Sequence, residues 1–316
     1  MAANLLITGP LGHIGSAFIH AIRRGRYGEI RLLDNFSSQR YVSLFNLPKG
    51  VRFSVLDDDI RTAPLEDYLK GIDVVLHLAA ITDAPASFDD PEQVHAVNYD
   101  GTRRLVEACV ARRCRLVFLS TTSVYGTQRS VVDETCAEED LRPQSPYATS
   151  KLEAERFLAK AGADAGLDFV TFRFGTIFGP SIGMRFHTAV NKFVWLAVNG
   201  RPLTVWRTAL HQRRPYLDLV DAVRALEFVV RKEVFDRRIY NVVTANATVN
   251  DIVRLIRRHV PAVRIEYVDS PVMNQLSYRV ASRRFQRLGF RYQGSLARGI
   301  AKTVRLLDGV RQGSRS

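Results

Sequence analysis

Cysteine is scarce in this chain, and its placement argues against two kinds of protein. The 316 residues contain three cysteines, Cys109, Cys114 and Cys136, and no C-x-x-C pair. An odd number of scattered cysteines does not form a disulfide framework, and it does not supply the paired ligands of a zinc site. We therefore expect no structural disulfide and no metal site, and we interpret the three side chains as small buried or partly buried thiols.

Long hydrophobic runs are also missing from the sequence. No apolar stretch approaches the ~20 residues that a membrane-spanning helix needs. The first residues, Met1–Asn4, carry no basic segment and lead directly into a short apolar run, which is not typical of a secretion signal. These absences predict a protein that has no membrane partner and stays in the cytoplasm.

Acidic residues are the minority among the charged side chains. The 45 lysines and arginines outnumber the 32 acidic residues and give a formal net charge of +13. Two interpretations compete: a basic patch for nucleic acid, or a surface that attracts small anionic substrates. The arginines form scattered pairs, such as Arg23–Arg24 and Arg213–Arg214, and no basic motif is interleaved with aromatic residues. This pattern favours a small anionic substrate and no nucleic-acid partner.

The first half of the chain alternates short apolar runs with helical patterns. Its composition, 46% hydrophobic and 24% charged, is ordinary for a globular protein. Strands are predicted at 4–8, 30–33, 51–55, 73–77, 115–120 and 168–172, and helices at 14–24, 91–112 and 146–161. Strict alternation implies parallel βαβ units with right-handed crossovers. We predict an α/β fold with a doubly wound parallel sheet of the Rossmann type.

The rhythm of the pattern changes after Gly175. Further helices are predicted at 187–199, 218–231, 249–259 and 295–307, and further strands at 202–206, 239–243 and 263–268. We interpret this part as a smaller, mixed α/β domain that binds the substrate. The predicted nucleotide-binding domain covers residues 1–175, with 213–245 returning to it. Residues 176–212 and 246–316 form the predicted substrate-binding domain.

Three glycines separate the first predicted strand from the first predicted helix. Gly9, Gly12 and Gly15 follow the spacing G-x-x-G-x-x-G. Such a turn allows the backbone to approach a pyrophosphate closely, and the pyrophosphate then lies at the positive end of the following helix. We therefore expect a dinucleotide cofactor to contact Gly9, Gly12, His13 and Ile14.

Carboxylates follow the second and third predicted strands. At the end of the second strand, Asp34 is placed to accept hydrogen bonds from the adenosine ribose and to repel the additional phosphate of NADP. Asn35 comes next, and no arginine follows the strand immediately, so NAD is the favoured cofactor. Asp59 is predicted to meet the adenine amino group, with Ile60 packing on the base; a solvated acidic turn is the alternative.

Tyr147 and Lys151 form a Y-x-x-x-K motif on the predicted helix 146–161. A spacing of four residues puts both side chains on one helix face. Tyrosine has an ordinary pKa of about 10, so it is a poor base at neutral pH unless nearby positive charges stabilise its phenolate. A lysine ammonium and a nicotinamide ring both supply such charge. Because the fifth predicted strand ends in hydroxyl side chains, the pattern predicts oxidation of a substrate hydroxyl.

Together these motifs resemble the extended short-chain dehydrogenase/reductase family, in its branch of nucleotide-sugar epimerases and dehydratases such as UDP-glucose 4-epimerase. The resemblance covers nearly the whole chain. It is carried by segments 8–15, 33–35, 77–80, 97–102, 123–126, 147–151, 173–174 and 178–180. It implies NAD as the cofactor, a nucleotide-diphosphate sugar as the substrate, and a homodimer in which helices 91–112 and 146–161 pair with their copies in a four-helix bundle.

The resemblance also assigns roles to particular residues. The catalytic hydroxyl falls on Thr121, the base on Tyr147, and its partner, which also holds the nicotinamide ribose, on Lys151. Arg214 matches the arginine that clamps the phosphates of the nucleotide, to which its fork of donors is suited. The remaining positions in the cofactor shell are Leu78, Ala79, Ala80 and Asn98.

Several positions depart from the family pattern where the substrate is expected. Dehydratases carry Asp-Glu after the catalytic threonine, whereas this chain has Thr122 and Ser123, so dehydration is not expected. These two residues are predicted substrate contacts, as is Thr176, which replaces the usual asparagine. Arg185 is predicted to meet a sugar carboxylate or a phosphate, with a solvated arginine as the alternative. Asn191 completes the predicted substrate-binding set.

Three hypotheses for function follow. The leading one is epimerisation of a nucleotide sugar at C4, through a 4-keto intermediate that takes back its hydride. The second is a 4-dehydrogenase or decarboxylase that releases a keto sugar or a pentose product. The third is a non-catalytic NAD sensor or scaffold, against which the intact set of Thr121, Tyr147 and Lys151 argues.

Overall fold

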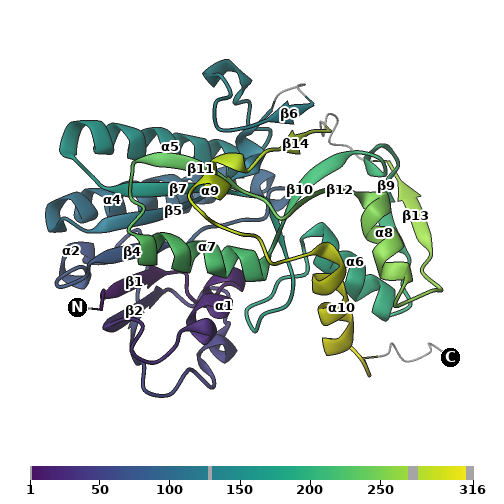
Figure 1. Ribbon diagram of the computed structural model, residues 1–316, viewed down its shortest axis with the longest axis horizontal. Coiled ribbons are helices and arrows are strands. Elements are labelled where there is room, and N and C mark those ends of the chain that lie inside the picture. Colours follow the sequence, from purple (N-terminus) through teal and green to yellow (C-terminus); the bar gives the residue numbers. More distant parts are fainter. Residues whose placement is uncertain (1, 127–129, 270–276, 311–316) are drawn as a thin grey trace.

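A seven-stranded parallel sheet forms the centre of the molecule in the computed structural model, which describes residues 2–126, 130–269 and 277–310 (Figure 1). The strand order is β11-β7-β5-β4-β1-β2-β3. The bounds are β1 Leu5–Thr8, β2 Glu29–Asp34, β3 Arg52–Asp57, β4 Val74–His77, β5 Arg115–Thr121, β7 Phe169–Phe174 and β11 Arg238–Val242. The predicted doubly wound Rossmann-type sheet is confirmed.

Helices cover both faces of this sheet, and an apolar core lies under each layer. The helices α1 (His13–Ala21) and α7 (Leu219–Lys232) pack together over one face. On the other face lie α2 (Leu65–Tyr68), α4 (Gly101–Arg112) and α5 (Pro146–Ala165). Because both faces are covered, the central strands are apolar almost throughout, and all four residues of β1 and of β4 are buried.

One helix of the second layer has an irregular turn that the sequence pattern did not indicate. The predicted helix 91–112 begins as α3 (Pro91–His95), continues through a π-helical turn at Ala96–Asp100 and ends as α4. Single π-helical turns within α-helices occur frequently at functional sites. Asn98, which the sequence places in the cofactor shell, lies in this turn.

The strands β8, β10 and β12 form a second sheet beside the first, near the smaller lobe that occupies the right of Figure 1. The lobe packs three amphipathic helices, α6, α8 and α10, around their own apolar core. The bounds are α6 Ala189–Val198, α8 Val249–Arg257, α9 Arg283–Arg287, α10 Leu296–Leu306, β6 Val131–Val132, β8 Thr176–Phe178, β9 Leu203–Trp206, β10 Arg213–Asp218, β12 Ala245–Thr248, β13 Ile265–Val268 and β14 Arg279–Val280.

Strand β10 lies between the predicted strand 202–206 and the predicted helix 218–231, where the sequence pattern indicated no strand. It is the middle strand of the three-stranded sheet, between β12 and β8. Proline has no backbone N–H and is unusual in a middle strand, and Pro215 therefore hid β10 from the sequence pattern. The next two elements, α7 and β11, lie against and within the main sheet. The residue boundaries of the two domains stay a prediction.

The direction of winding changes between β1 and β4, which are neighbours in the sheet. The chain proceeds from β1 through β2 to β3 on one side, and from β4 through β5 and β7 to β11 on the other. In sheets of this kind the loops after the two central strands diverge and leave a crevice at their carboxyl ends, where ligands bind. The residues after β1 and β4 therefore lie where a ligand is expected.

Candidate active site

The glycine turn after β1 lies directly against the residues that follow β4. Gly9 has a φ of 65°, and a Cβ built on it would lie 2.7 Å from the backbone N and Cα of Ala79. Only glycine fits this turn without strain. Helix α1 starts at His13, and no side chain caps its N-terminus. A helix N-terminus that no side chain caps, preceded by a glycine turn, suits the phosphates of a dinucleotide.

The carboxyl ends of β2 and β3 bring three predicted cofactor residues together. One oxygen of Asp34 accepts from the backbone N–H of Leu11, at 3.3 Å, so this carboxylate lies beside the glycine turn. The amide of Asn35 donates to Asp59 at 2.8 Å, and Asp59 also pairs with Arg61 at 2.9 Å. The Arg61 guanidinium holds the pKa of Asp59 well below its usual range.

The side chain of Ile60, another predicted cofactor residue, faces the interior. It is 6% exposed and belongs to the apolar core under α2 and α4. A Cβ on Gly101 would lie 2.8 Å from its side chain, so Ile60 fills the space between β3 and α4. Its contact with the adenine base stays a prediction.

A buried hydrogen-bond chain joins the ends of β1 and β4. The His77 ring bonds the hydroxyl of Thr8 at 2.7 Å on one side and that of Thr102 at 2.8 Å on the other. The Thr8 hydroxyl also accepts from the N–H groups of Leu78 and Ala79. Burial lowers the pKa of His77 to about 3, so the ring is neutral and its role is structural. The sequence analysis did not identify this network, because its partners lie far apart in the chain.

Asn98 connects the cofactor crevice to the helix that carries the predicted base. Its side chain is fully buried and accepts from the N–H of Ile81 at 2.8 Å, while its amide donates to the Ile81 carbonyl at 2.9 Å. The same amide donates to the Ser150 hydroxyl at 3.2 Å. Asn98 therefore fixes the backbone that continues from Ala80 relative to α5.

Thr121 and Tyr147, from β5 and α5, meet at the edge of the crevice. The Thr121 hydroxyl is hydrogen-bonded to the Tyr147 phenol and lies 3.1 Å from the Ser123 hydroxyl. Helix α5 starts at this point because Ser145 caps it and Pro146 occupies its first position. Burial raises the pKa of Tyr147 to about 12, and the bond to Thr121 opposes this rise. Additional positive charge is therefore needed to make Tyr147 a base.

Lys151 lies one turn along α5 from Tyr147, in a nearly dry environment. Its side chain is 3% exposed, and its ammonium lies 4.8 Å from the centre of the Phe118 ring. Burial lowers the pKa of Lys151 to about 7, and the charge of Glu155 opposes this. Glu155 in turn forms a buried ion pair with Arg173.

The predicted substrate contacts after β5 differ in where their hydroxyls point. Ser123 is exposed and lies next to Thr121. Thr122 is 3% exposed, and its hydroxyl donates to the Phe174 carbonyl at 3.3 Å. The carbonyl of Thr122 accepts from the Tyr278 hydroxyl at 3.1 Å. The hydroxyl of Thr122 is therefore used within the fold, and its substrate contact stays a prediction.

Tyr278, which the sequence analysis did not identify, also contacts the predicted phosphate clamp. The Arg214 guanidinium lies over the Tyr278 ring, 5.5 Å from its centre. The same guanidinium donates a hydrogen bond to the side-chain oxygen of Gln212 at 3.4 Å. Burial lowers the pKa of Arg214 without removing its charge. Thr176, on the neighbouring strand β8, pairs with Tyr216 of β10. Two of the predicted substrate contacts, Thr176 and Arg214, thus lie on neighbouring strands of one small sheet.

Asn191 and Arg185 belong to the segment that follows β8. The side chain of Asn191 is 1% exposed; its oxygen accepts from the Gly179 N–H at 3.2 Å, and its amide donates to the Arg185 carbonyl at 3.1 Å. Asn191 therefore holds both ends of a loop. The Arg185 guanidinium donates to the Thr82 hydroxyl at 3.3 Å, beyond the end of β4.

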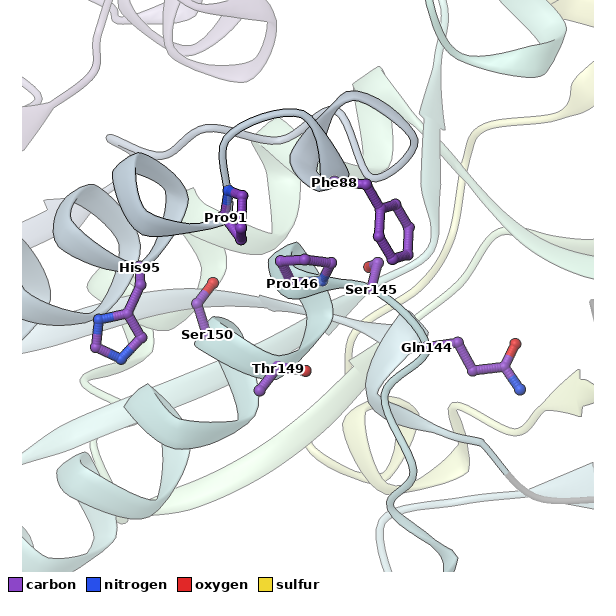
Figure 2. A pocket seen from close by; sticks show the side chains of 8 residues that line it. All are labelled: Phe88, Pro91, His95, Gln144, Ser145, Pro146, Thr149 and Ser150. Carbon is purple, nitrogen blue, oxygen red and sulfur yellow. The ribbon is translucent and has the colours of Figure 1, made fainter. Parts of the chain in front are cut away.

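A cavity of about 450 Å³ lies beside α3 and the N-terminal turn of α5 (Figure 2). Its lining residues are Phe88, Pro91, His95, Gln144, Ser145, Pro146, Thr149 and Ser150. None of Thr121, Tyr147 and Lys151 lines it. The predicted catalytic residues therefore do not form the wall of this cavity.

The comparisons with known proteins bear on this arrangement. The model of the "NAD dependent epimerase/dehydratase family" matches residues 5–242, which include the sheet, the glycine turn and the Thr121, Tyr147 and Lys151 set. The chain belongs to this family. Its cofactor is NAD, and the residues around the crevice fit that group, because the glycine turn, the uncapped helix and Asp34 meet at one point.

Three similar proteins are described as epimerases or dehydratases of UDP-glucose. The chain is 30% identical to an uncharacterized UDP-glucose epimerase of Bacillus subtilis, over 72% of this chain and 73% of that protein. It is 29% identical to a trifunctional UDP-glucose 4,6-dehydratase, epimerase and reductase of Arabidopsis thaliana, over 95% of this chain, and spans 46% of that protein's length. The UDP-glucose 4-epimerase of Thermus thermophilus, solved with NAD, is 27% identical with a TM-score of 0.80, covering 97% and 99% of the chains.

No helix in the described part of the chain is both long and apolar enough to cross a membrane.

Proposed function

We propose that this protein is an NAD-dependent epimerase that inverts C4 of a nucleotide-diphosphate sugar. The observation that carries the proposal is the grouping of Thr121, Tyr147 and Lys151 at the edge of the cofactor crevice, with no carboxylate next to Thr121. The trio suits the oxidation of a hydroxyl. The absence of the carboxylate separates this site from the dehydratases of the family.

Each member of the trio has a distinct task. Thr121 donates a hydrogen bond to the substrate hydroxyl oxygen and holds it beside Tyr147. Tyr147 takes the hydroxyl proton and later returns it, and the charge of Lys151 stabilises the phenolate between these events. Bound NAD supplies the hydride acceptor and donor. The buried position of Lys151, 3% exposed, strengthens its field at the phenol because little water screens it.

The two residues that follow Thr121 decide what can happen to the 4-keto sugar. Elimination of water from C5 and C6 needs an acid and a base, which the family's dehydratases supply as Asp and Glu. Thr122 and Ser123 carry hydroxyls, which do neither task at neutral pH. The keto sugar is therefore left to turn in the site and to accept the hydride on its other face.

The nucleotide end of the substrate is assigned to the small sheet. Arg214 clamps the diphosphate, and its stacking on Tyr278 presets the orientation of the guanidinium fork. Ser123 and Thr176 contact the sugar. Thr122 lines the same turn, and Asn191 supports the site through the loop that it holds.

Two further predictions from the sequence belong to the proposal. We place the protein in the cytoplasm as a homodimer, with α4 and α5 of each protomer in a four-helix bundle. Mass measurement in solution, for example by light scattering, tests the dimer: a single species of one chain's mass would contradict it.

Proton NMR of the purified protein with UDP-, GDP-, CDP- and dTDP-sugars and a trace of NAD tests the function. We expect one sugar to give a new C4 epimer, with no accumulation of NADH. If NADH and a keto sugar instead accumulate in step with substrate loss, the protein is a 4-dehydrogenase. Release of carbon dioxide from a uronic acid would identify a decarboxylase.

A further inference from the structure

The segment Gly179–Arg185, which we call the strap, crosses from the small sheet onto the glycine turn. The Ser181 hydroxyl donates to the backbone carbonyl of His13 at 2.9 Å. The N–H of Gly183 donates to the Ser16 hydroxyl at 3.0 Å. The strap is therefore fastened to the first turns of α1, where the phosphates of NAD are expected.

Two further contacts hold the strap in place. The His13 ring donates to the Gly179 carbonyl at 2.7 Å, and burial lowers the pKa of His13 to about 4, so the ring is neutral. A Cβ on Gly183 would lie 2.3 Å from the Leu11 carbonyl oxygen and 2.6 Å from that of Gly12. The strap lies so close to the turn that glycine is required at this position.

The strap carries Arg185 to the rim of the crevice, where a second arginine lies. Arg185 donates to Thr82 beyond β4, while Arg40 lies beyond β2. The two guanidinium groups lie near enough to act on one another, and each also acts on the Asp34 carboxylate. Asp83 also acts on Arg185. The Nη1 atom of Arg40 is buried, and no described group accepts a hydrogen bond from it.

This arrangement is costly without an anion. Two partly buried cations repel each other, and a buried donor without an acceptor loses the bond that it makes to water. Asp34 and Asp83 offset part of the charge, but neither is a hydrogen-bond acceptor for Arg40 Nη1. An oxygen-rich anion at the N-terminus of α1 would supply the missing acceptor.

We propose that Arg40 and Arg185 bind the phosphates of NAD, and that the strap fastens the cofactor in the crevice between turnovers. Arg185 is then a cofactor residue rather than a contact to the sugar. A fastened cofactor suits a reaction in which one NAD is reduced and reoxidised without leaving. The proposal itself needs only the family's use of NAD, and it stands or falls independently of which sugar is epimerised.

Cofactor retention by the purified holoprotein is the measurement. Wild-type, Arg185→Met and Arg40→Met proteins are purified identically, and bound NAD per chain and its rate of release on dilution are determined. Each lost charge-assisted bond contributes about 1.5–3 kcal/mol, so we expect release to be at least about 10-fold faster in each variant. Calorimetric binding of UDP-glucose to NAD-saturated protein should change less than about 2-fold.

Matched variants separate binding from general damage. Arg257→Met, on the exposed end of α8, should release NAD like wild type. Gly183→Ala should release NAD faster although both arginines remain, because its Cβ forces the strap off the turn. If Arg185→Met retains NAD but weakens UDP-glucose binding 10-fold or more, Arg185 belongs to the substrate and the proposal is wrong. Should Arg185→Met fail to fold, unchanged release in Arg40→Met would overturn it as well.

Discussion

The cofactor side and the substrate side of the crevice are built differently. On the cofactor side, several of the predicted residues belong to local features of the sequence: a glycine turn, a helix start and a carboxylate at a strand end. On the substrate side, two of the predicted contacts, Thr122 and Asn191, use their side chains to bond backbone groups within the fold. The first side is recognisable from short motifs, whereas the second depends on how separate segments meet.

This difference suggests how the family changes substrate while keeping NAD. Residues that are predicted to hold the cofactor follow the strands β1, β2 and β4, which pair within the main sheet. The substrate side is formed by the small sheet, the strap and Tyr278, which pack outside the main sheet. Five substitutions, two of them with a control variant, break or sharpen the contrast, from the largest expected effect to the smallest.

Replacing Tyr147 with phenylalanine should abolish most of the enzymatic activity. Loss of a general base costs about 10²–10⁴-fold, and we expect kcat to fall by about 10³-fold. The ring keeps its packing, so the thermal midpoint should stay within about 2 °C of wild type. NMR turnover and a melting curve measure the two effects. A loss below about 10-fold would mean that another group takes the proton.

Lys151→Met tests whether the buried charge acts on the base. We expect kcat/KM to fall by about 10²-fold and the pH at which activity is half-maximal to rise, because the phenolate of Tyr147 loses its stabilising cation. The control is Lys160→Met, further along α5, whose exposed ammonium pairs with Asp164. A pH profile that keeps its position in Lys151→Met would contradict the role.

Lys151→Met should also change how the free energy of unfolding depends on pH. The pKa of Lys151 is about 7 in the folded, cofactor-free protein and about 10.4 in the unfolded chain. Between these values the unfolded chain binds the additional proton, so the free energy of unfolding rises with pH. Urea unfolding at pH 6.5 and 9 should show this rise in wild type and a smaller one in Lys151→Met.

Gly9→Ala tests the backbone character of the cofactor side. The added Cβ meets Ala79 at 2.7 Å in a left-handed backbone conformation, so we expect NAD affinity to fall by about 100-fold, or about 2.7 kcal/mol. Gly166→Ala is the matched control, because Gly166 has a φ of 70° but nothing within 4 Å of its Cβ. That variant should lose about 1–2 kcal/mol of stability and bind NAD normally. Equal NAD affinities in the two variants would contradict the close-approach argument.

These contrasts also mark how far the sequence alone could go. Alternating apolar runs predicted every strand of the main sheet, and the apolar signal is continuous in central strands such as β4, whose residues are all buried. Spacing placed Tyr147 and Lys151 one turn apart, since a helix fixes that geometry. The strand β10 was missed because Pro215 contradicts a middle strand locally, and only its neighbours β8 and β12 explain it.

The contacts on the substrate side could not be predicted for a similar reason. The hydroxyl of Thr122 and the carbonyl of Phe174 are 52 residues apart, and Tyr278 reaches Thr122 from 156 residues away. No local pattern encodes such a pair. The sequence analysis noted segment 178–180 only as part of the family resemblance, and the fastening of the strap to Ser16 depends on the approach of the small sheet to α1.

The neighbouring threonines of β5 give the smallest and sharpest test. Thr121→Val removes a hydroxyl that meets Tyr147, and we expect kcat/KM to fall by about 10–100-fold, the value of a hydrogen bond to a charged group. Thr122→Val removes one that donates to Phe174 inside the fold, so kcat/KM should change by less than about 3-fold while stability falls by about 1 kcal/mol. Both variants delete the same atom two bonds from the backbone, and turnover by NMR with a melting curve compares them directly. If Thr122→Val lost activity as Thr121→Val does, with an unchanged melting temperature, its hydroxyl would have to leave Phe174 for the sugar. The substrate contacts would then be as directly predictable from sequence as the cofactor contacts.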